Sequence, residues 1–278
     1  SLSLGVAEPY GSGLGGKLTL LYYEAATGKT YAVDAMDAAG TLDAKAYVAR
    51  PEDNRSYGYS AVCVPGLAAG LWTAHQKWGK RPWADNVAPA IALARTGFEI
   101  LSKSRDLFAE QEKKLCRGDA EIARLYLPNG ELPAIGSRLP NEDLAKTMEL
   151  LAQHGPDGFY RGPVAAAIVA ASQAGGGNIS ADDLAHFEAE VTQPLQLDFR
   201  GYRLLSSPPP TTGAPLFLTI MKVFETEPLV APLRAPANLA KIGRVWREVR
   251  DLVYQGIGDA PESVFYYEKM VAPDSIAK

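Results

Sequence analysis

Glycine is concentrated in one short run near the start of the chain, where its spacing could serve nucleotide chemistry. Residues 11–16 read Gly-Ser-Gly-Leu-Gly-Gly, which fits the G-x-G-x-x-G pattern of dinucleotide-binding loops. Such a loop follows a strand and opens a helix, whose N-terminus binds the pyrophosphate. Here Glu8-Pro9 precedes the run, a β-prone segment follows it, and Leu18 stands where a Walker loop needs Ser or Thr. A structural role is therefore favoured, with nucleotide binding as the weaker alternative.

The residues that usually perform hydrolysis are sparse. His75, His154 and His186 lie in predicted helical or capping positions, without the spacing of metal ligands, and the sequence has no G-x-S-x-G motif. Thr211-Thr212 offers two hydroxyl groups, but it stands between three prolines and Gly213, a context that predicts a turn leading into a helix. We therefore expect no catalytic residue and no metal site in this chain, and no cofactor.

Two pairs of β-prone segments predict hairpins. Segments 18–23 and 30–34 flank a polar stretch that ends in Thr27-Gly28-Lys29, and a second hairpin is expected over 194–206, with its turn at Arg200-Gly201. Helical runs separate these hairpins. The arrangement predicts an antiparallel α+β fold rather than a doubly wound parallel sheet.

Capping residues and apolar spacing predict the helices. Asn141 can cap a helix that ends at Gly155, and Ser180 with Asp183 has the spacing of a capping box. The charged segment Arg105–Arg124 is interpreted as a solvated helical face. The other helices are expected over 65–78, 163–173, 214–226 and 237–255.

Composition limits the partners. The chain has 278 residues, of which 47% are hydrophobic and 22% charged, enough for one large domain or two small ones. A formal charge of -4 without a Lys/Arg block argues against nucleic acid or an anionic membrane surface. Cys63 and Cys116 are favoured as buried thiols over one disulfide. No apolar run approaches the roughly 20 residues of a membrane span, and no signal peptide is visible.

Two long blocks of sequence resemble one enzyme family. The first block begins with LGVAEPYGSGLGG at residues 4–16, which resembles the family pattern LGV-EP-x-x-SG-[IL]-GGG. Further along the chain, the same block includes VPGLAAGL at residues 64–71. The second contains NEDLAKT at 141–147, GPDGFYRG at 155–162, ISADDLA at 179–185 and PPPTTG at 208–213. Taken together over residues 4–225, they resemble the large subunit of a gamma-glutamyltransferase.

The resemblance implies a fold and a second chain. The expected fold is α+β, the large-subunit portion of the four-layer αββα sandwich of N-terminal nucleophile hydrolases. Residues 1–278 would form a single domain of a two-chain unit and begin some tens of residues into the family fold. The family's precursor cleaves itself, and the threonine that then begins the small subunit is the nucleophile, whose own α-amine takes the hydroxyl proton.

The expected partners follow from the same resemblance. They are the small subunit from the same precursor and a small-molecule amide substrate, with no nucleic acid and no membrane span. The resemblance suggests a periplasmic or secreted location and leaves a cytoplasmic one open.

The segment from Asp34 to Gly40 departs from the family pattern D-[FY]-R-E-x-A-P. The resemblance implies that the arginine of this pattern forms a bidentate pair with the α-carboxylate of the γ-glutamyl group. Met36 takes the arginine position, Asp37 the glutamate position and Gly40 the proline position. Methionine cannot neutralise a carboxylate, and a charge-assisted hydrogen bond of this kind contributes about 1.5–3 kcal/mol. Met36 and Asp37 are the predicted substrate-binding residues.

Three explanations of Met36 stay open. A cation elsewhere, including on the partner, can replace the arginine; the substrate can lack an α-carboxylate; or catalysis can have been lost. The second is favoured, because the family contains acylases that act on other amides. Asp37 is equally compatible with a solvated turn. The sequence thus predicts an amidase or acyltransferase with altered acyl specificity; the alternatives are a genuine glutathione hydrolase with a substitute cation and a non-catalytic relative.

Overall fold

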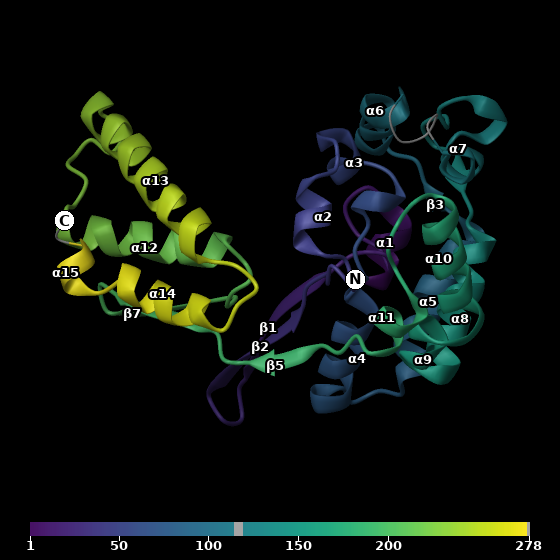
Figure 1. The fold of residues 1–278 in the computed structure, drawn as a ribbon, viewed down its shortest axis with the longest axis horizontal. Coiled ribbons are helices and arrows are strands. Elements are labelled where there is room, and N and C mark those ends of the chain that lie inside the picture. Colours follow the sequence, from purple (N-terminus) through teal and green to yellow (C-terminus); the bar gives the residue numbers. More distant parts are fainter. Residues whose placement is uncertain (114–118, 277–278) are drawn as a thin grey trace. The chain divides into compact units, whose positions relative to one another are not determined.

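The chain divides into two compact units. A computed structural model describes residues 1–113 and 119–276. Unit 1 comprises residues 1–18 and 35–189, and unit 2 comprises 19–34 and 190–278 (Figure 1). The sequence analysis predicted that residues 1–278 form a single domain of a two-chain unit, and this stays a prediction.

Unit 1 is mainly helical. Its core contains Val87 and Ala94 of α5 with Met148 and Leu151 of α8, and these two helices make the most extensive helix–helix contact of the unit. Its described helices are α1 (Leu2–Ala7), α2 (Ala44–Val48), α3 (Glu52–Ser56), η1 (Tyr59–Ala61), α4 (Leu67–Trp78), α5 (Trp83–Thr96), α6 (Ser102–Gln111), α7 (Ala120–Tyr126), η3 (Pro128–Gly130), α8 (Glu142–His154), α9 (Asp157–Tyr160), α10 (Gly162–Ala174) and α11 (Ala181–Ala185), and strands β3 (Phe98–Glu99) and β4 (Arg138–Leu139) pair antiparallel.

The predicted caps form in unit 1. The Asn141 side chain accepts the N–H of Leu144 at 2.9 Å, and Gly155 ends α8 with a φ of 59° that favours glycine. Ser180 and Asp183 form the reciprocal capping box of α11. These local signals are confirmed because each lies within one turn of the helix that it begins or ends.

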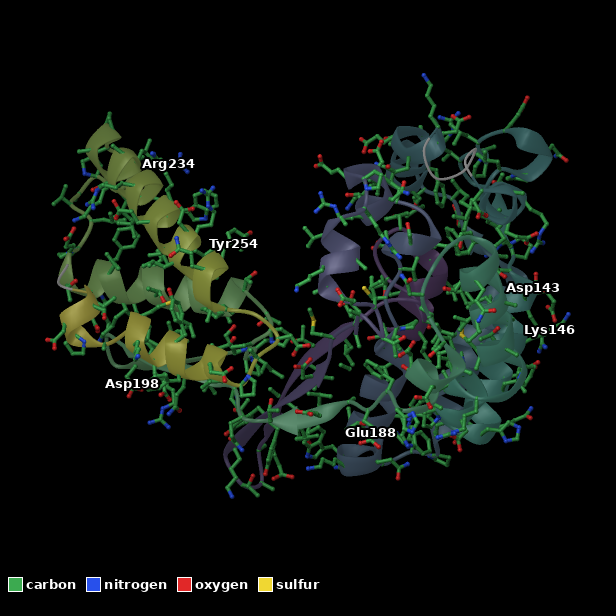
Figure 2. All side chains as sticks on the ribbon, viewed as in Figure 1. Asp143, Lys146, Glu188, Asp198, Arg234 and Tyr254 are labelled. Carbon is green, nitrogen blue, oxygen red and sulfur yellow. The ribbon has the colours of Figure 1, made fainter. Side chains whose placement is uncertain are left out.

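Helix α8 separates its apolar and polar faces as expected. Met148 and Leu151 are fully buried, as is Ala145 beside them. Asp143 and Lys146 lie on the outer side of the helix (Figure 2). Burial of such an apolar stripe, rather than helix propensity alone, holds a helix of this length in place.

Unit 2 combines two small sheets with helices. Strands β1 (Leu18–Glu24), β2 (Lys29–Ala35) and β5 (Glu190–Thr192) form a sheet in the order β1-β2-β5, and β6 (Leu195–Phe199) pairs with β7 (Tyr202–Ser206). Within unit 2, the described pairings of β2 with β5 and of β6 with β7 are both antiparallel. The helices described in this unit are α12 (Gly213–Thr226), α13 (Pro236–Gly256), α14 (Glu262–Met270) and α15 (Pro273–Ile276).

Local residue types explain the hairpins of unit 2. Arg200 and Gly201 both have positive φ, 49° and 82°, which is the geometry of a tight two-residue turn between β6 and β7. Leu195 and Leu197 alternate inward and pack in one core with Leu218 of α12. Both predicted hairpins are therefore confirmed, as are the helices expected over 214–226 and 237–255.

The charged segment Arg105–Arg124 is described only in part. It is helical in α6 and α7, and Glu110 is exposed there, as a solvated face requires. Lys114, Cys116 and Arg117 lie outside the described residues. None of the helices in the described ranges is long and apolar enough to cross a bilayer.

Candidate functional site

Met36 is the first residue beyond strand β2, and its position is fixed by the backbone before it. Ala35, the last residue of the strand, is buried, and Met36 is half-buried. A Cβ placed on Gly66 would overlap the carbonyl group of Ala35 and also touch the ring of Phe187. Only glycine permits this approach, so the end of β2 is pressed against the start of α4.

The glycine run at residues 11–16 also contacts the start of α4. The carbonyl of Gly16 accepts the N–H groups of Gly66 and Leu67, both at 3.0 Å. Gly16 itself donates to the carbonyl of Gly13 at 3.0 Å, which closes a turn just before Lys17. Helix α1 precedes the run and β1 follows it, so the run lacks the strand-before, helix-after context of a dinucleotide loop.

Tyr160 secures the first turn of α4. Its buried hydroxyl donates to the carbonyl of Pro65 at 2.6 Å and accepts the N–H of Ala69 at 3.3 Å. Burial raises the pKa of this hydroxyl far above its usual range, so it stays protonated and keeps donating. Tyr160 therefore ties α9 to the first turn of α4 through two hydrogen bonds.

Asp37 lies in an ion pair. Its Oδ1 is 3.1 Å from Nζ of Lys17, and the two side chains are 33% and 53% exposed, respectively. The next residue, Ala38, exchanges two backbone hydrogen bonds with Val64, at 3.3 and 2.8 Å. Asp37 is exposed and lies between this backbone bridge and the Lys17 cation.

Cys63 is the third member of this cluster. It carries a free, partly buried thiol. Burial raises the pKa of the Cys63 thiol, and the charge of Asp37 and a hydrogen bond to Asp37 raise it further, while Lys17 acts in the opposite direction. The thiol is therefore neutral near pH 7, and the cluster of Lys17, Asp37 and Cys63 carries no net charge.

Gly40, which the sequence alignment predicts at the proline position of the family pattern, has a backbone conformation that favours glycine. Its φ is +67°, and a Cβ there would lie 3.0 Å from Oδ2 of Asp183. Proline, which the pattern has at this position, is restricted to φ near −65°. The segment that follows Met36 therefore has a conformation that the pattern's proline could not adopt.

The sequence-predicted residues and the structural cluster overlap only in part. Met36 and Asp37 are neighbours at the end of β2, but sequence reasoning missed Lys17 and Cys63 as the charged and polar neighbours of Asp37. The sequence held one signal for Lys17. The family pattern has three consecutive glycines, and Lys17 stands at the position of the third, directly after Gly16.

The remaining candidates occupy the places expected for structural residues. His75 lies in α4, His154 ends α8, and His186 follows α11. The hydroxyl of Thr211 donates to the carbonyls of Ser207 and Pro208, within the predicted turn before α12. In the described part of the chain, no group of three or more His, Cys, Asp or Glu side chains is placed to hold a metal ion.

Unit 2 contains a separate large cavity of about 1220 Å³. Lys29, Asp34, Arg203 and Tyr267 are among its lining residues, and Met36 and Asp37 are not. Its volume exceeds the roughly 300–1,000 Å³ typical of small-ligand clefts. The predicted site residues Met36 and Asp37 lie at the end of β2, outside this cavity.

Comparison with known proteins gives consistent matches. Residues 1–242 match the family model of gamma-glutamyltranspeptidase. The glutathione hydrolase proenzyme of Bacillus subtilis (strain 168) is 33% identical over 230 residues, which are 80% of this chain and 39% of that protein. The chain thus spans less than half the length of such curated relatives.

Solved structures match over nearly the whole chain. The gamma-glutamyltranspeptidase from Pseudomonas nitroreducens complexed with L-DON superposes with a TM-score of 0.89 at 26% identity, covering 99% of this chain and 83% of that chain. Cephalosporin acylase from Bacillus halodurans gives a TM-score of 0.81 at 20% identity, over 99% of this chain and 52% of the other. These likenesses confirm the predicted α+β fold of the N-terminal nucleophile hydrolase type.

Proposed function

Because this chain belongs to the gamma-glutamyltranspeptidase family, we propose that it is the large subunit of an autoprocessed amidase or acyltransferase. The nucleophile is a threonine at the start of a partner small subunit made from the same precursor. The name proenzyme carried by the Bacillus relative supports a processed precursor. The cluster at the end of β2 supports placing the nucleophile on the partner subunit. This cluster contains the Lys17–Asp37 ion pair and a protonated Cys63 thiol, but no activated nucleophile.

The reaction is acyl transfer through an ester. The threonine hydroxyl attacks the amide carbonyl while the threonine's own α-amine accepts the hydroxyl proton. The C–N bond then breaks, the amine product leaves with that proton, and the acyl group remains on the threonine oxygen. Water or a second amine attacks this ester in the next step and frees the threonine.

The contribution of this chain is recognition of the acyl group. The observation that carries this proposal is Met36, which occupies the arginine position of the family pattern on a platform fixed by Gly66 and by the Ala38–Val64 bridge. Without the arginine, a donor α-carboxylate loses about 1.5–3 kcal/mol of charge-assisted hydrogen bonding. Apolar, flexible methionine instead favours an acyl chain that has no such carboxylate.

Two measurements test the proposal. Intact mass and N-terminal sequencing of the full expressed precursor should show a second chain that begins with threonine. The processed protein should then cleave a simple acyl anilide at a steady-state rate equal to or higher than its rate for the γ-glutamyl anilide. A strong preference for the γ-glutamyl compound would contradict altered specificity, and an uncleaved precursor would favour a non-catalytic relative.

A genuine glutathione hydrolase with a substitute cation is the second candidate. Lys17 favours this candidate, because the Lys17 ammonium group lies beside Asp37, which directly follows Met36. That charge is already paired with Asp37 at 3.1 Å, so a donor carboxylate would have to compete with it. Altered acyl specificity is therefore the better supported function.

A further inference from the structure

We propose that the large cavity of unit 2 is a docking groove for a basic, partly apolar segment of the partner small subunit. This inference rests on the proposed function, which requires a second chain, and it names the surface that receives that chain. All residues that line the cavity belong to unit 2. Its volume of about 1220 Å³ is larger than that of a typical small-ligand cleft, so a stretch of polypeptide fits it better.

One face of the sheet β1-β2-β5 forms a wall of this cavity. In the antiparallel register of β2 and β5, Asp34 lies directly opposite Glu190, and Ala32 lies opposite Thr192. Paired residues project to the same face of a sheet, so Asp34, Glu190 and Thr192 share the face that lines the cavity. Strand β5 lies at the edge of the sheet as described, and an edge strand can pair with a strand from another chain.

Exposed apolar side chains form another part of the lining. Tyr23 is 62% exposed, and Leu205 and Val264 are also exposed. Pro208–Pro210 adds a stiff apolar wall, because the pyrrolidine rings fix φ. Exposed apolar surface that gathers in one place marks an interaction site, and a preformed wall lowers the entropic cost of binding.

The charges of the lining favour a basic partner segment. Carboxylates outnumber cations by four to two, the residues being Asp34, Glu190, Asp259 and Glu268 against Lys29 and Arg203. Arg203 is already paired with Asp198 at 3.4 Å, so its charge is compensated. Like charges directly opposite each other in a sheet, as Asp34 and Glu190 are, disfavour the pairing. A Lys or Arg side chain of the partner would remove this repulsion.

The relatives leave room for such a segment. This chain covers 39% of the length of the glutathione hydrolase proenzyme of Bacillus subtilis (strain 168). A second chain made from a precursor of similar length is long enough to supply a strand for the groove. The proposed partner is therefore this second chain rather than a free small molecule.

Photocrosslinking of the processed two-chain protein tests the groove directly. Tyr23→benzoylphenylalanine places a crosslinker in the lining, and the matched control is the same change at Tyr202, which is 73% exposed and lies outside the cavity. Position 23 should join the large subunit to the small subunit, through a segment that contains Lys or Arg, and position 202 should not. No product, equal yield from both positions, or a product of two large subunits would overturn the inference.

Alkylation gives a second readout that needs no crosslinker. In a Cys63→Ser, Cys116→Ser background, Val264→Cys should lose most of its reactivity with a maleimide, because the partner covers it. Val230→Cys is the matched control, since Val230 is exposed and lies outside the cavity, and it should react freely. Equal reactivity at the two positions would contradict the groove.

A charge reversal tests the preference for a basic segment. Glu190→Lys can pair with Asp34 and so keeps the sheet, but it should lower the urea concentration at which the two subunits separate. It should also weaken the effect of NaCl on that separation, because salt screens the attraction. Glu188→Lys makes the same change at an exposed position outside the cavity and should behave like the wild type (Figure 2).

The outcomes separate this inference from the proposed function. Amide cleavage by a protein that shows neither crosslinking at position 23 nor protection at position 264 would overturn the groove and leave the proposed function intact. An inactive, uncleaved precursor that still protects Val264→Cys would support the groove, filled by the downstream part of the precursor, and overturn the proposed function.

Discussion

Gly66 packs directly against the carbonyl group of Ala35, so that a side chain at position 66 would overlap the backbone that leads into Met36. This contact joins the end of β2 to the start of α4 without any side chain between them. It explains how the predicted binding residue is placed, because Met36 follows Ala35 with no freedom to shift toward the helix.

Gly66→Ala should therefore displace the end of β2 or destabilise unit 1. Forcing an extra methyl group into a packed site costs about 1–3 kcal/mol. Chemical denaturation of the processed protein measures this loss. Gly15→Ala is the matched control, because a Cβ at Gly15 meets nothing within 4 Å and should leave the free energy of unfolding almost unchanged.

Met36→Arg should raise the preference for γ-glutamyl donors. A guanidinium group at this position can pair with the donor α-carboxylate, and kcat/KM for the γ-glutamyl anilide should rise at least about tenfold relative to the simple acyl anilide. Met36→Lys supplies the same charge without bidentate geometry and should gain less. Equal ratios in the wild type and both variants would show that position 36 does not contact the acyl group.

The alkylation rate of Cys63 should report how Asp37 and Lys17 affect the pKa of its thiol. In a Cys116→Ser background, Cys63 should react with iodoacetamide slowly near pH 7 and faster as the pH rises, because its raised pKa lowers the thiolate fraction. Asp37→Asn removes a cause of the raised pKa and should speed the reaction at pH 7. Lys17→Met removes the opposing cation and should slow it; the same rate in all three proteins would contradict this arrangement.

The cap of α8 can be tested by substitution. Asn141→Ala removes the acceptor for the Leu144 N–H and should lower the free energy of unfolding by about 1 kcal/mol. Asn141→Asp keeps an acceptor at the same place and should retain most of the stability. Urea denaturation of both variants distinguishes loss of the cap from a general effect of changing residue 141.

Two buried tyrosines should respond differently to loss of the hydroxyl group. The hydroxyl of Tyr267 is buried without a hydrogen-bond partner among the described residues, and burial raises the pKa of Tyr267 to about 12. Tyr267→Phe should leave stability unchanged or raise it. Tyr160→Phe removes two hydrogen bonds and should lower stability by about 1 kcal/mol or more. Thermal unfolding of the two variants provides the comparison.

Local signals made some elements predictable and left others out. The hairpins and α8 were predictable because turn residues and caps act within a few positions. Helix α5 was not, because it contains Pro89, and its packing against α8 outweighs that local signal. Helices α2 and α3 have no buried residues, so they leave no apolar periodicity in the sequence.

The sequence by itself determined the family resemblance and led to the prediction that Met36 takes the place of the pattern's arginine, because both depend on runs of adjacent residues. The tertiary structure decided which groups surround that position. Lys17 and Asp37 are 20 positions apart in the chain, and their 3.1 Å contact depends on how Gly16 and the Ala38–Val64 bridge bring two segments together. No local pattern encodes such a meeting, since it follows from the packing of distant backbone segments rather than from residue type.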